Sequence, residues 1–475
     1  MFRDPRDERI AELEGQLAER DARIVELEAK LERALKRIAE LEDKIGRNSS
    51  NSNQPPSKDT PEQRRNRPKP PPSGRKPGGQ PGHKPQQREL LPPEQVSQVV
   101  DHCPGECENC GAALAHVDDP DPVRHQVIDL PEIRPEVIEH RLHAGECDEC
   151  GHCTRASLPT GVPRSPWGPR LLALIAIVTG ACRVSRRQAV LFLQDVLGIG
   201  MSLGALSEAE QRVSKAVAPA VEQAAEFARV QPVKHVDATS WATAGAYRAL
   251  WTISTALVTV FFITRDGTYG TVKSLLRRAR GILVTDRAKV FGFWVMRQRQ
   301  ICWAHLIRKF AGFAERGGAG SQLARELHQT AELMFHQIHR VRDGTMTRRQ
   351  FRQGMHNIRV RVQWLLERGM ALGVRGFSGT CADILHHREA LWTFVDRDDV
   401  EPTNNLAERD LRPFVLWRSS SQGTQSERGE RYAERIMTVA HTLRKQKRSV
   451  FRYLHDACAN ALYDNPPPSL LPSGP

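Results

Sequence analysis

The 475-residue sequence contains no apolar run long enough to cross a lipid bilayer. A spanning helix needs about 20 consecutive apolar residues, whereas the longest apolar run here extends only from Leu171 to Val178. The first residues are strongly charged, unlike those of a secretory signal peptide. These two absences argue against a membrane partner and predict a cytoplasmic protein.

The sequence has fewer acidic than basic residues. There are 69 Lys and Arg against 56 Asp and Glu, which gives a formal net charge of +13. Such a balance favours a polyanionic partner, because it attracts phosphate backbones without reading their sequence. The length suffices for roughly two to four folded units with their own cores. Ten cysteines in a cytoplasmic protein indicate metal binding or reduced thiols rather than disulfides.

Residues 1–47 are predicted to form a coiled coil, because apolar residues repeat every seven positions from 8 to 46. The a positions are Ile10, Leu17, Ile24, Leu31, Ile38 and Ile45, and the d positions are Leu13, Arg20, Leu27, Ala34 and Leu41. Ile at a with Leu at d favours a parallel two-stranded coil, and therefore a homodimer or a larger oligomer. The alternative is a single helix packed on its own protein.

The segment over 48–95 is rich in Asn, Ser, Pro, Gly and Arg and has too few apolar side chains to offset the entropy of ordering the chain. We expect a disordered basic linker there, which serves either as a tether or as an arm that contacts phosphates. Residues 463–475 are rich in Pro and are expected to form a disordered tail.

Two Cys-x-x-Cys pairs lie within residues 96–165, which are predicted to form a zinc-binding module. The expected ligands are Cys107, Cys110, Cys147 and Cys150. Each pair can form one knuckle, and two knuckles can close a tetrahedral thiolate site for a structural Zn²⁺. Cys103 and Cys153 flank the pairs and are weaker candidates. Between the pairs, strands over 124–130 and 136–142 are expected to form a small sheet.

Residues 166–230 are predicted to be helical. An apolar helix, a turn containing Gly198 and Gly200, and a second helix lie between positions 185 and 207. This pattern fits a helix-turn-helix whose second helix enters the major groove of DNA. Ordinary helix packing produces the same degenerate pattern, so both interpretations stay open.

Residues 231–305 are predicted to form the first part of an α/β core. Three strands, the first carrying Asp237, are followed by a helix near 272–280 and by an apolar strand that ends at Asp286. A further helix and a strand over 298–303 complete the series. This is the order expected of a ribonuclease-H-like sheet, and it places the two aspartates on adjacent strands.

A third acid, Glu408, lies in the first turns of a helix whose start is marked by Pro402–Asn405. Residues 306–398 are predicted to be a basic helical insertion, and residues 399–462 complete the core. Carboxylates on two strands and a helix can hold two Mg²⁺ ions for an in-line phosphoryl displacement. A single aspartate is more often only a strand-end residue, so the prediction depends on the surroundings of the three acids.

Five sequence blocks surround these acids in order along the chain. They are His235-Val-Asp237-Ala-Thr-Ser-Trp241, Val284-Thr-Asp286, Cys302-Trp-Ala-His305-Leu-Ile-Arg308-Lys-Phe310, Pro402-Thr-Asn-Asn405-Leu-Ala-Glu408-Arg-Asp-Leu-Arg-Pro413 and Gly423-Thr-Gln-Ser-Glu-Arg-Gly429. Together they resemble the insertion-sequence-66 family of transposases. The resemblance implies a multidomain α/β protein with a ribonuclease-H-like core, catalytic Asp237, Asp286 and Glu408, and a zinc-binding module. Ala238 departs from the family, which usually has an acid there.

The resemblance also implies metal-dependent cleavage at transposon ends and strand transfer into target DNA. Double-stranded DNA is then the expected partner, the expected location is the cytoplasm at the nucleoid, and accessory transposition proteins are further candidate partners. The candidate DNA contacts are the basic residues near the predicted metal site: His305, Arg308, Arg409, Arg412 and Arg418. A lone histidine such as His305 is more often a structural group.

Two other functions stay open. The first is a catalytically inactive, zinc-containing DNA-binding or regulatory protein derived from a transposase, and Ala238 is the feature that favours it. The second is a ribonuclease or junction resolvase on the same fold. Neither of those nuclease activities explains the coil, the zinc module and the helical insertion together.

Overall fold

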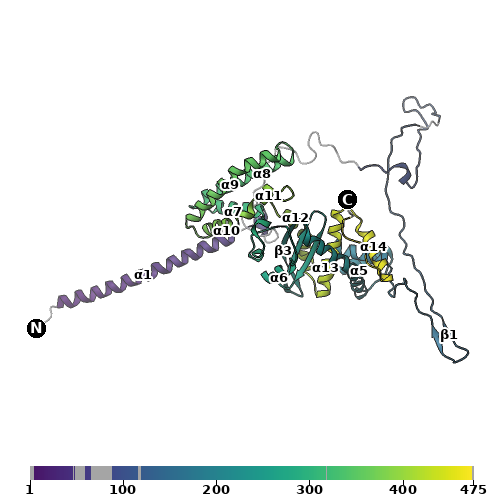
Figure 1. Cartoon of the computed structure of the whole chain (residues 1–475), viewed down its shortest axis with the longest axis horizontal. Helices are drawn as coiled ribbons and strands as arrows, with labels where there is room; N and C mark the ends of the chain where they lie inside the picture. The colour runs from purple at the N-terminus through teal and green to yellow at the C-terminus, as the bar shows by residue number, and fades with distance from the viewer. Residues whose placement is uncertain are drawn as a thin grey trace.

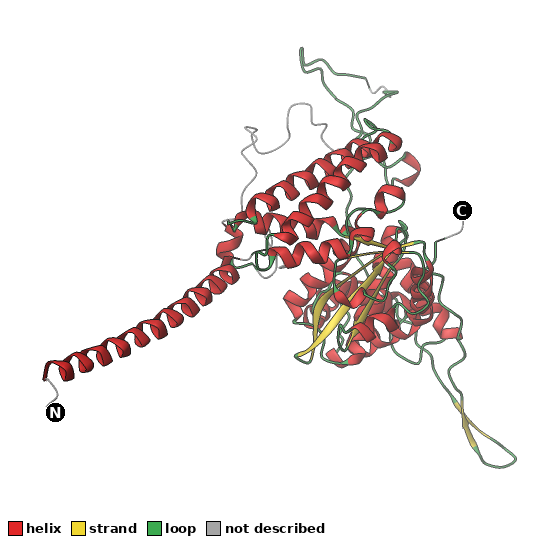
Figure 2. Ribbon diagram, turned by 60° about the vertical axis from the view of Figure 1, so that its left-hand side comes forward, coloured by secondary structure: helices red, strands yellow, loops and turns green. Residues whose placement is uncertain are grey.

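The structure is a computed structural model that describes residues 5–46, 48, 59–65, 88–115, 119–316 and 318–472. It is mixed α/β, with one five-stranded sheet set among helices and a further group of helices beside it (Figure 2). Most of the linker expected over 48–95 lies outside the described residues. Within the described ranges, no helix is both long and apolar enough to cross a membrane.

Helix α1 (Pro5–Gly46) is a single continuous helix that extends away from the rest of the chain (Figure 1). Side chains at its heptad positions are exposed: Leu17 is 62% exposed, Ile24 52% and Leu31 60%. An apolar stripe that stays in water does not stabilise a helix, whereas its burial against a second helix would. The pairing of two such helices stays a prediction. A short helix, α2 (Pro61–Arg65), follows.

The central sheet has the strand order β5-β4-β3-β6-β7. The strands are β3 (Val233–Thr243), β4 (Ala246–Ser254), β5 (Thr259–Thr264), β6 (Ile282–Thr285) and β7 (Arg299–Ile301). Strands β3, β4 and β5 are antiparallel neighbours, whereas β6 runs parallel to β3 and β7 parallel to β6. The predicted adjacency of the Asp237 and Asp286 strands is confirmed.

The connections within the sheet differ in part from the prediction. Helix α6 (Tyr269–Leu275) joins β5 to β6 and begins earlier than expected. The helix predicted between β6 and β7 is wrong, because this connection contains only two 3₁₀ turns, Lys289–Phe291 and Met296–Gln298. A parallel crossover needs only about a dozen residues, and this one is held against the sheet by the buried ring of Phe291, which packs edge-on to Trp251 at 6.2 Å.

Helices cover both faces of the sheet. The remaining helices around it are α3 (Pro169–Ala176), α4 (Arg186–Leu197), α5 (Leu203–Val230), α12 (Asn405–Ser421), α13 (Glu427–Lys445) and α14 (Val450–Asn460). On β4, Ile253 packs into the core that contains α5, whereas Leu250 packs against Leu411 and Phe414 of α12. Successive side chains of a strand point to opposite faces, so α5 and α12 lie on opposite sides.

The segment predicted as a helix-turn-helix does form two helices, α4 and α5. Gly198 ends α4 in a left-handed conformation with φ of 66°, and the side chain of Ser202 caps α5 by accepting from the amide of Ala205. Helix α5 buries residues along its whole length, from Leu206 to Ala228. It is therefore a core helix, and its contact with DNA stays a prediction.

Strand β5 lies at one edge of the sheet, and α13 closes that edge. The amides of Thr259 and Phe261 donate to the hydroxyls of Thr442 and Thr438, both at 3.1 Å, and the amide of Ile263 donates to Glu434. Alternate strand amides thus meet side chains spaced four residues apart on the helix. An edge strand satisfied in this way does not pair with another chain.

The region predicted as a helical insertion, residues 306–398, is mostly helical, and its core also includes Ile282, Val284 and Ile301 of the sheet. Its helices are α7 (Trp303–Glu315), α8 (Ser321–Arg342), α9 (Arg348–Ala371), α10 (Phe377–His386) and α11 (Thr393–Asp396). Several of its arginines pair within the chain, for example Arg348 with Asp398 at 2.6 Å and Arg359 with Asp396 at 3.2 Å. These pairs weaken the expectation that this basic surface contacts DNA.

Two predictions about the outer segments are wrong. Residues 124–130 and 136–142 form no strands, because their apolar side chains are exposed and have no core to pack against; Val127 is 81% exposed. The tail expected to be disordered is held by the fold as far as residue 472. Leu470 is fully buried, and the hydroxyl of Tyr453 donates to the carbonyl of Pro468 at 2.8 Å.

Candidate catalytic and metal site

Asp237 and Asp286 occupy equivalent places on adjacent parallel strands. His235 of β3 is level with Val284 of β6, and each aspartate lies two residues further along its own chain. Since side chains alternate along extended chain, the two carboxylates lie at the same end of the sheet and on the same side. Each is oriented by a local hydrogen bond of 2.9 Å, from the amide of Ala238 to Asp237 and from the amide of Ala288 to Asp286.

Glu408 lies in the first turn of α12, and the buried Asn404 fixes where that helix begins. The side-chain amide of Asn404 donates to the carbonyl of Val236 at 2.9 Å, its side-chain oxygen lies 3.2 Å from Nδ1 of His235, and its backbone amide donates to Sγ of Cys302 at 3.1 Å. The side chain of Asn404 thus joins the start of α12 to β3, and its backbone amide joins it to the residue that follows β7. These bonds hold Glu408 beside the strand that carries Asp237.

The three predicted acids interact electrostatically. Burial raises the pKa of Asp237 from its ordinary value of 3.8 to about 8, repulsion from Asp286 and Glu408 adds to the rise, and Arg308 opposes it. Ala238 is exposed, whereas Asp237 is partly buried, as expected for neighbours on opposite faces of a strand. The alanine at position 238 therefore removes no carboxylate from this cluster.

The raised pKa of Asp237 predicts an unusual pH dependence of stability. A carboxyl with a higher pKa in the folded chain stabilises the fold at low pH, and this contribution is lost as pH rises from about 4 through about 8. Without added Mg²⁺ the melting temperature should therefore fall over this range, and added Mg²⁺ should recover more of it at pH 8 than at pH 6. In Asp237→Asn this part of the slope should vanish. If the melting temperature of Asp237→Asn falls with pH as steeply as that of the unaltered chain, the pKa of Asp237 is not raised by the fold.

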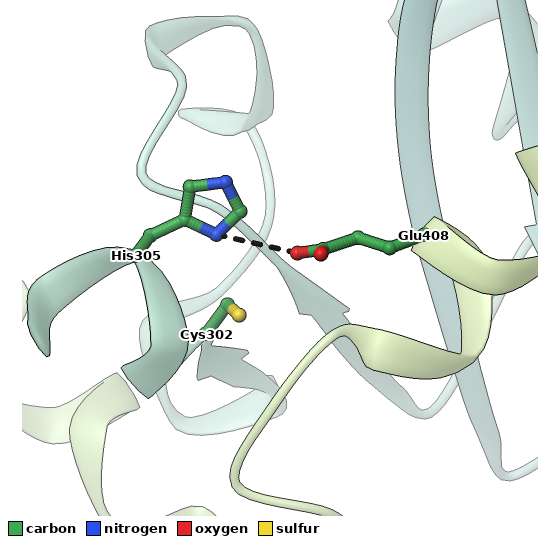
Figure 3. A group of neighbouring side chains, drawn as sticks. All are labelled: Cys302, His305 and Glu408. Carbon is green, nitrogen blue, oxygen red and sulfur yellow. Dashed lines mark ion pairs between the residues drawn. The ribbon is translucent and has the colours of Figure 1, made fainter. Parts of the chain in front are cut away.

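Cys302 and His305 face Glu408 across the site (Figure 3). Nδ1 of His305 lies 3.6 Å from Oε1 of Glu408, and single donor atoms of Cys302, His305 and Glu408 all lie within 4.8 Å of one another. Burial and the nearby charge of Arg308 lower the pKa of His305, so its imidazole is neutral at neutral pH. The prediction missed Cys302, although the three-residue spacing from Cys302 to His305 was a usable signal because it puts both on one helical turn.

The predicted DNA-contacting arginines fall into two groups. Arg308 lies 3.9 Å from Glu408, and Arg418 donates to the side chains of Thr239 at 3.2 Å and Ser240 at 2.5 Å on β3. These two guanidinium groups are half-buried and already have partners within the fold. Arg409 and Arg412 are exposed on α12, and among the described residues neither forms an ion pair. Arg409 and Arg412 can therefore meet a phosphate without giving up an ion pair, whereas Arg308 would share its guanidinium between Glu408 and a phosphate.

Comparison with known families places the chain in one of them. A model described as the Transposase IS66 family matches residues 164–432, which is more than half of the chain and includes all three acids. The chain belongs to the IS66 transposase family. The family implies transposition, a DNA-processing enzyme and DNA as its partner. A second model, a family of unknown function (DUF6444), matches residues 3–89 of this transposase. The search of curated proteins with the whole chain found no match.

The two cysteine pairs of the transposase form turns with the same hydrogen bonds. In the first, the amide of Cys107 donates to the carbonyl of Ala112 and the amide of Gly111 donates to the carbonyl of Cys107, both at 2.9 Å. In the second, Cys147 bonds to His152 and Gly151 bonds to Cys147, at 3.0 and 2.8 Å. The second turn joins β1 (Ala144–Glu146) to β2 (Cys153–Arg155).

In each turn, backbone groups form hydrogen bonds to the thiol of the first cysteine. A hydrogen bond from the backbone of Asn109 lowers the pKa of Cys107, and one from the backbone of Cys150 lowers the pKa of Cys147. A lower pKa favours the thiolate, which is the form that binds metal. Among the described residues the two turns do not gather into one set of ligands, so a shared four-thiolate site stays a prediction.

Proposed function

We propose that this transposase cuts DNA at transposon ends and joins the freed 3′ ends to target DNA, with Asp237, Asp286 and Glu408 as its catalytic acids. The supporting observation is that Asp237 on β3, Asp286 directly after the neighbouring β6 and Glu408 on α12 lie near enough for the charges of Asp286 and Glu408 to help raise the pKa of Asp237. The ligand atoms of these three acids do not all lie within 4.8 Å of one another. Neighbouring carboxylates repel one another and destabilise the fold unless a cation lies between them. A catalytic role that requires bound cations explains why this chain has three acids at this place.

We infer that the core is ribonuclease-H-like. Three antiparallel strands lead the sheet, the first of them pairs with β6, and β7 follows in parallel, which is the order expected from the sequence. The short connection between β6 and β7 departs from the expected helix. It leaves unchanged the feature that matters for the site, the place of Asp237 and Asp286 on neighbouring strands.

The donor set fits Mg²⁺. Oxygen ligands are what this cation prefers, and Oε1 of Glu408 is buried without a hydrogen-bond donor. Asp237, Asp286 and Glu408 would hold two such ions. When bound, they would supply positive charge to the attacking and leaving oxygens of an in-line phosphoryl displacement.

The remaining residues would orient the DNA and compensate its charge. Arg308, beside Glu408, places a guanidinium where the scissile phosphate has to approach. Arg409 and Arg412 project from the exposed side of α12 and bind the phosphates that flank it. In phosphoryl transfer most of the rate comes from such positioning and charge stabilisation.

Cleavage of a labelled transposon end in Mg²⁺ tests the proposal. The unaltered chain should cut the end, and Asp286→Asn should not. The alternative is an inactive DNA-binding protein, for which Ala238 was the sequence argument. That alternative predicts end binding by both proteins and cleavage by neither.

We also propose that the two cysteine turns share one structural Zn²⁺. The purified chain should then contain about one zinc per molecule. Replacing Cys147 by Ser should remove that zinc and weaken DNA binding, while the melting of the catalytic core is unchanged, because none of its buried residues lies in this module. Zinc content by elemental analysis is the measurement. The matched control is Cys103→Ser, and loss of zinc in that variant but not in Cys147→Ser would reassign the ligands.

A further inference from the structure

Cys302, His305 and Glu408 form a second potential metal-binding set, distinct in composition from the three acids. Cys302 precedes the first turn of α7 and His305 lies in it, so the three-residue spacing brings both side chains to one face of the helix. Glu408 reaches them from α12 (Figure 3). Ligand atoms bound to one tetrahedral Zn²⁺ lie roughly 3.3–3.8 Å apart. The 3.6 Å separation of His305 and Glu408 already falls in that range.

Two of the three ligand atoms have no hydrogen-bond partner within the described chain. Nδ1 of His305 and Oε1 of Glu408 are both buried and have no hydrogen bond within the described chain. Unsatisfied buried polar atoms are costly and require an explanation. Sγ of Cys302 accepts from the amide of Asn404 at 3.1 Å, an outer contact that orients the sulfur as in many metal sites.

The chemistry of the set selects a different ion from the acid cluster. One sulfur, one imidazole nitrogen and one carboxylate oxygen suit Zn²⁺ or Co²⁺, whereas Mg²⁺ takes oxygen ligands. Three protein ligands leave a fourth position open for water. The site is partly open on the side of Glu408, whose side chain is 31% exposed, compared with 18% for His305.

We propose that Cys302, His305 and Glu408 bind Zn²⁺ at a site that shares Glu408 with the catalytic acids and that, when filled, switches cleavage off. Glu408 bound to zinc beside Cys302 and His305 is withdrawn from Asp237 and Asp286. Zinc and Mg²⁺ then compete for one carboxylate. The binding site stands on the contacts above, whereas the inhibitory effect rests on the proposed function.

Binding is tested with Co²⁺ on the full-length chain whose cysteine turns are already loaded with zinc. A thiolate-bound Co²⁺ absorbs in the near ultraviolet, so the readout is the absorbance lost on changing Cys302→Ala. Any Co²⁺ that replaces zinc in the cysteine turns contributes the same absorbance in the unaltered chain and in Cys302→Ala. This contribution therefore cancels when the two spectra are subtracted. The matched control is Cys458→Ala, which removes another buried thiol, in α14, and should keep the full signal.

The expected result is a signal that depends on Cys302 and whose apparent affinity falls at least about tenfold in both His305→Gln and Glu408→Gln. These two changes decide the question even if Cys302→Ala does not fold, and thermal melting identifies that case. A signal that is equal in all variants, or that is lost equally in Cys458→Ala, overturns the site.

The inhibitory effect is tested by the zinc concentration that halves each variant's own rate of cleavage in Mg²⁺. Cys302→Ala should need at least about ten times more zinc than the unaltered chain. Equal sensitivity would overturn the inhibitory role while leaving the binding result in place. If no variant cleaves DNA, the proposed function fails, and the cobalt signal still decides whether the site exists.

Discussion

Replacing Asp286 by Asn should abolish end cleavage and leave the fold and DNA binding intact. Loss of one charged group that acts on the transferring phosphate typically lowers such rates by about 10³-fold or more, and a neutral amide also holds Mg²⁺ poorly. The fold should survive because the side-chain oxygen of Asn can still accept the 2.9 Å hydrogen bond from Ala288. Asp237→Asn and Glu408→Gln should behave alike.

The matched control for this experiment is Asp195→Asn, which makes the same charge change on the exposed surface of α4. It should cleave at the rate of the unaltered chain. Cleavage of a labelled transposon end and binding of the same DNA are measured side by side. Cleavage that persists in Asp286→Asn would remove this aspartate from the catalytic set, and binding lost together with cleavage would indicate damage to the fold.

The apolar stripe of α1 predicts a dimer, and replacing Ile24 by Asp should then convert that dimer to a monomer. Ile24 occupies an a position in the middle of the α1 stripe and is 52% exposed in the single chain. In a parallel coil the two copies face each other, so the change puts two carboxylates at the centre of an apolar seam. Charges buried without partners are strongly destabilising. Light scattering of the full-length protein should show the mass falling to about half.

Val25→Asp provides the control for this experiment. Val25 is the next residue of the same helix and is 65% exposed, but it lies off the a and d stripe. The substitution makes the same chemical change outside the expected seam and should leave the dimer intact. If both variants stay dimeric, or if both dissociate, the heptad seam is not the interface. If end cleavage requires two paired DNA ends, it should fall in Ile24→Asp only.

The core was predictable because its pattern is local. Several of the strands appear in the sequence as apolar runs, and two strands are marked by an aspartate, Asp237 within β3 and Asp286 directly after β6. Glu408 follows residues that often start helices. Patterns of this kind depend on a few neighbouring residues. They predict the folded structure well because burial of the apolar residues decides which face of each strand points to the core.

Contacts between distant segments were not predictable in the same way. The side chain of Asn404 bonds to a strand nearly 170 residues earlier in the chain, and the arginines of the insertion find acids such as Asp398 that no sequence spacing indicates. The strands expected over 124–130 and 136–142 failed for a related reason. An alternating pattern needs a surface to pack on, and this region has none.

The sequence by itself predicted the helix within residues 1–47, the succession of strands along the chain and the two cysteine pairs from short-range spacing, and it predicted the three acids from the blocks that resemble the IS66 family. Only the tertiary structure decided that Glu408 lies beside both the aspartates and the Cys302–His305 pair. That position depends on where α12 is anchored on the sheet. The anchor is a set of long-range hydrogen bonds, and these have no counterpart in local sequence.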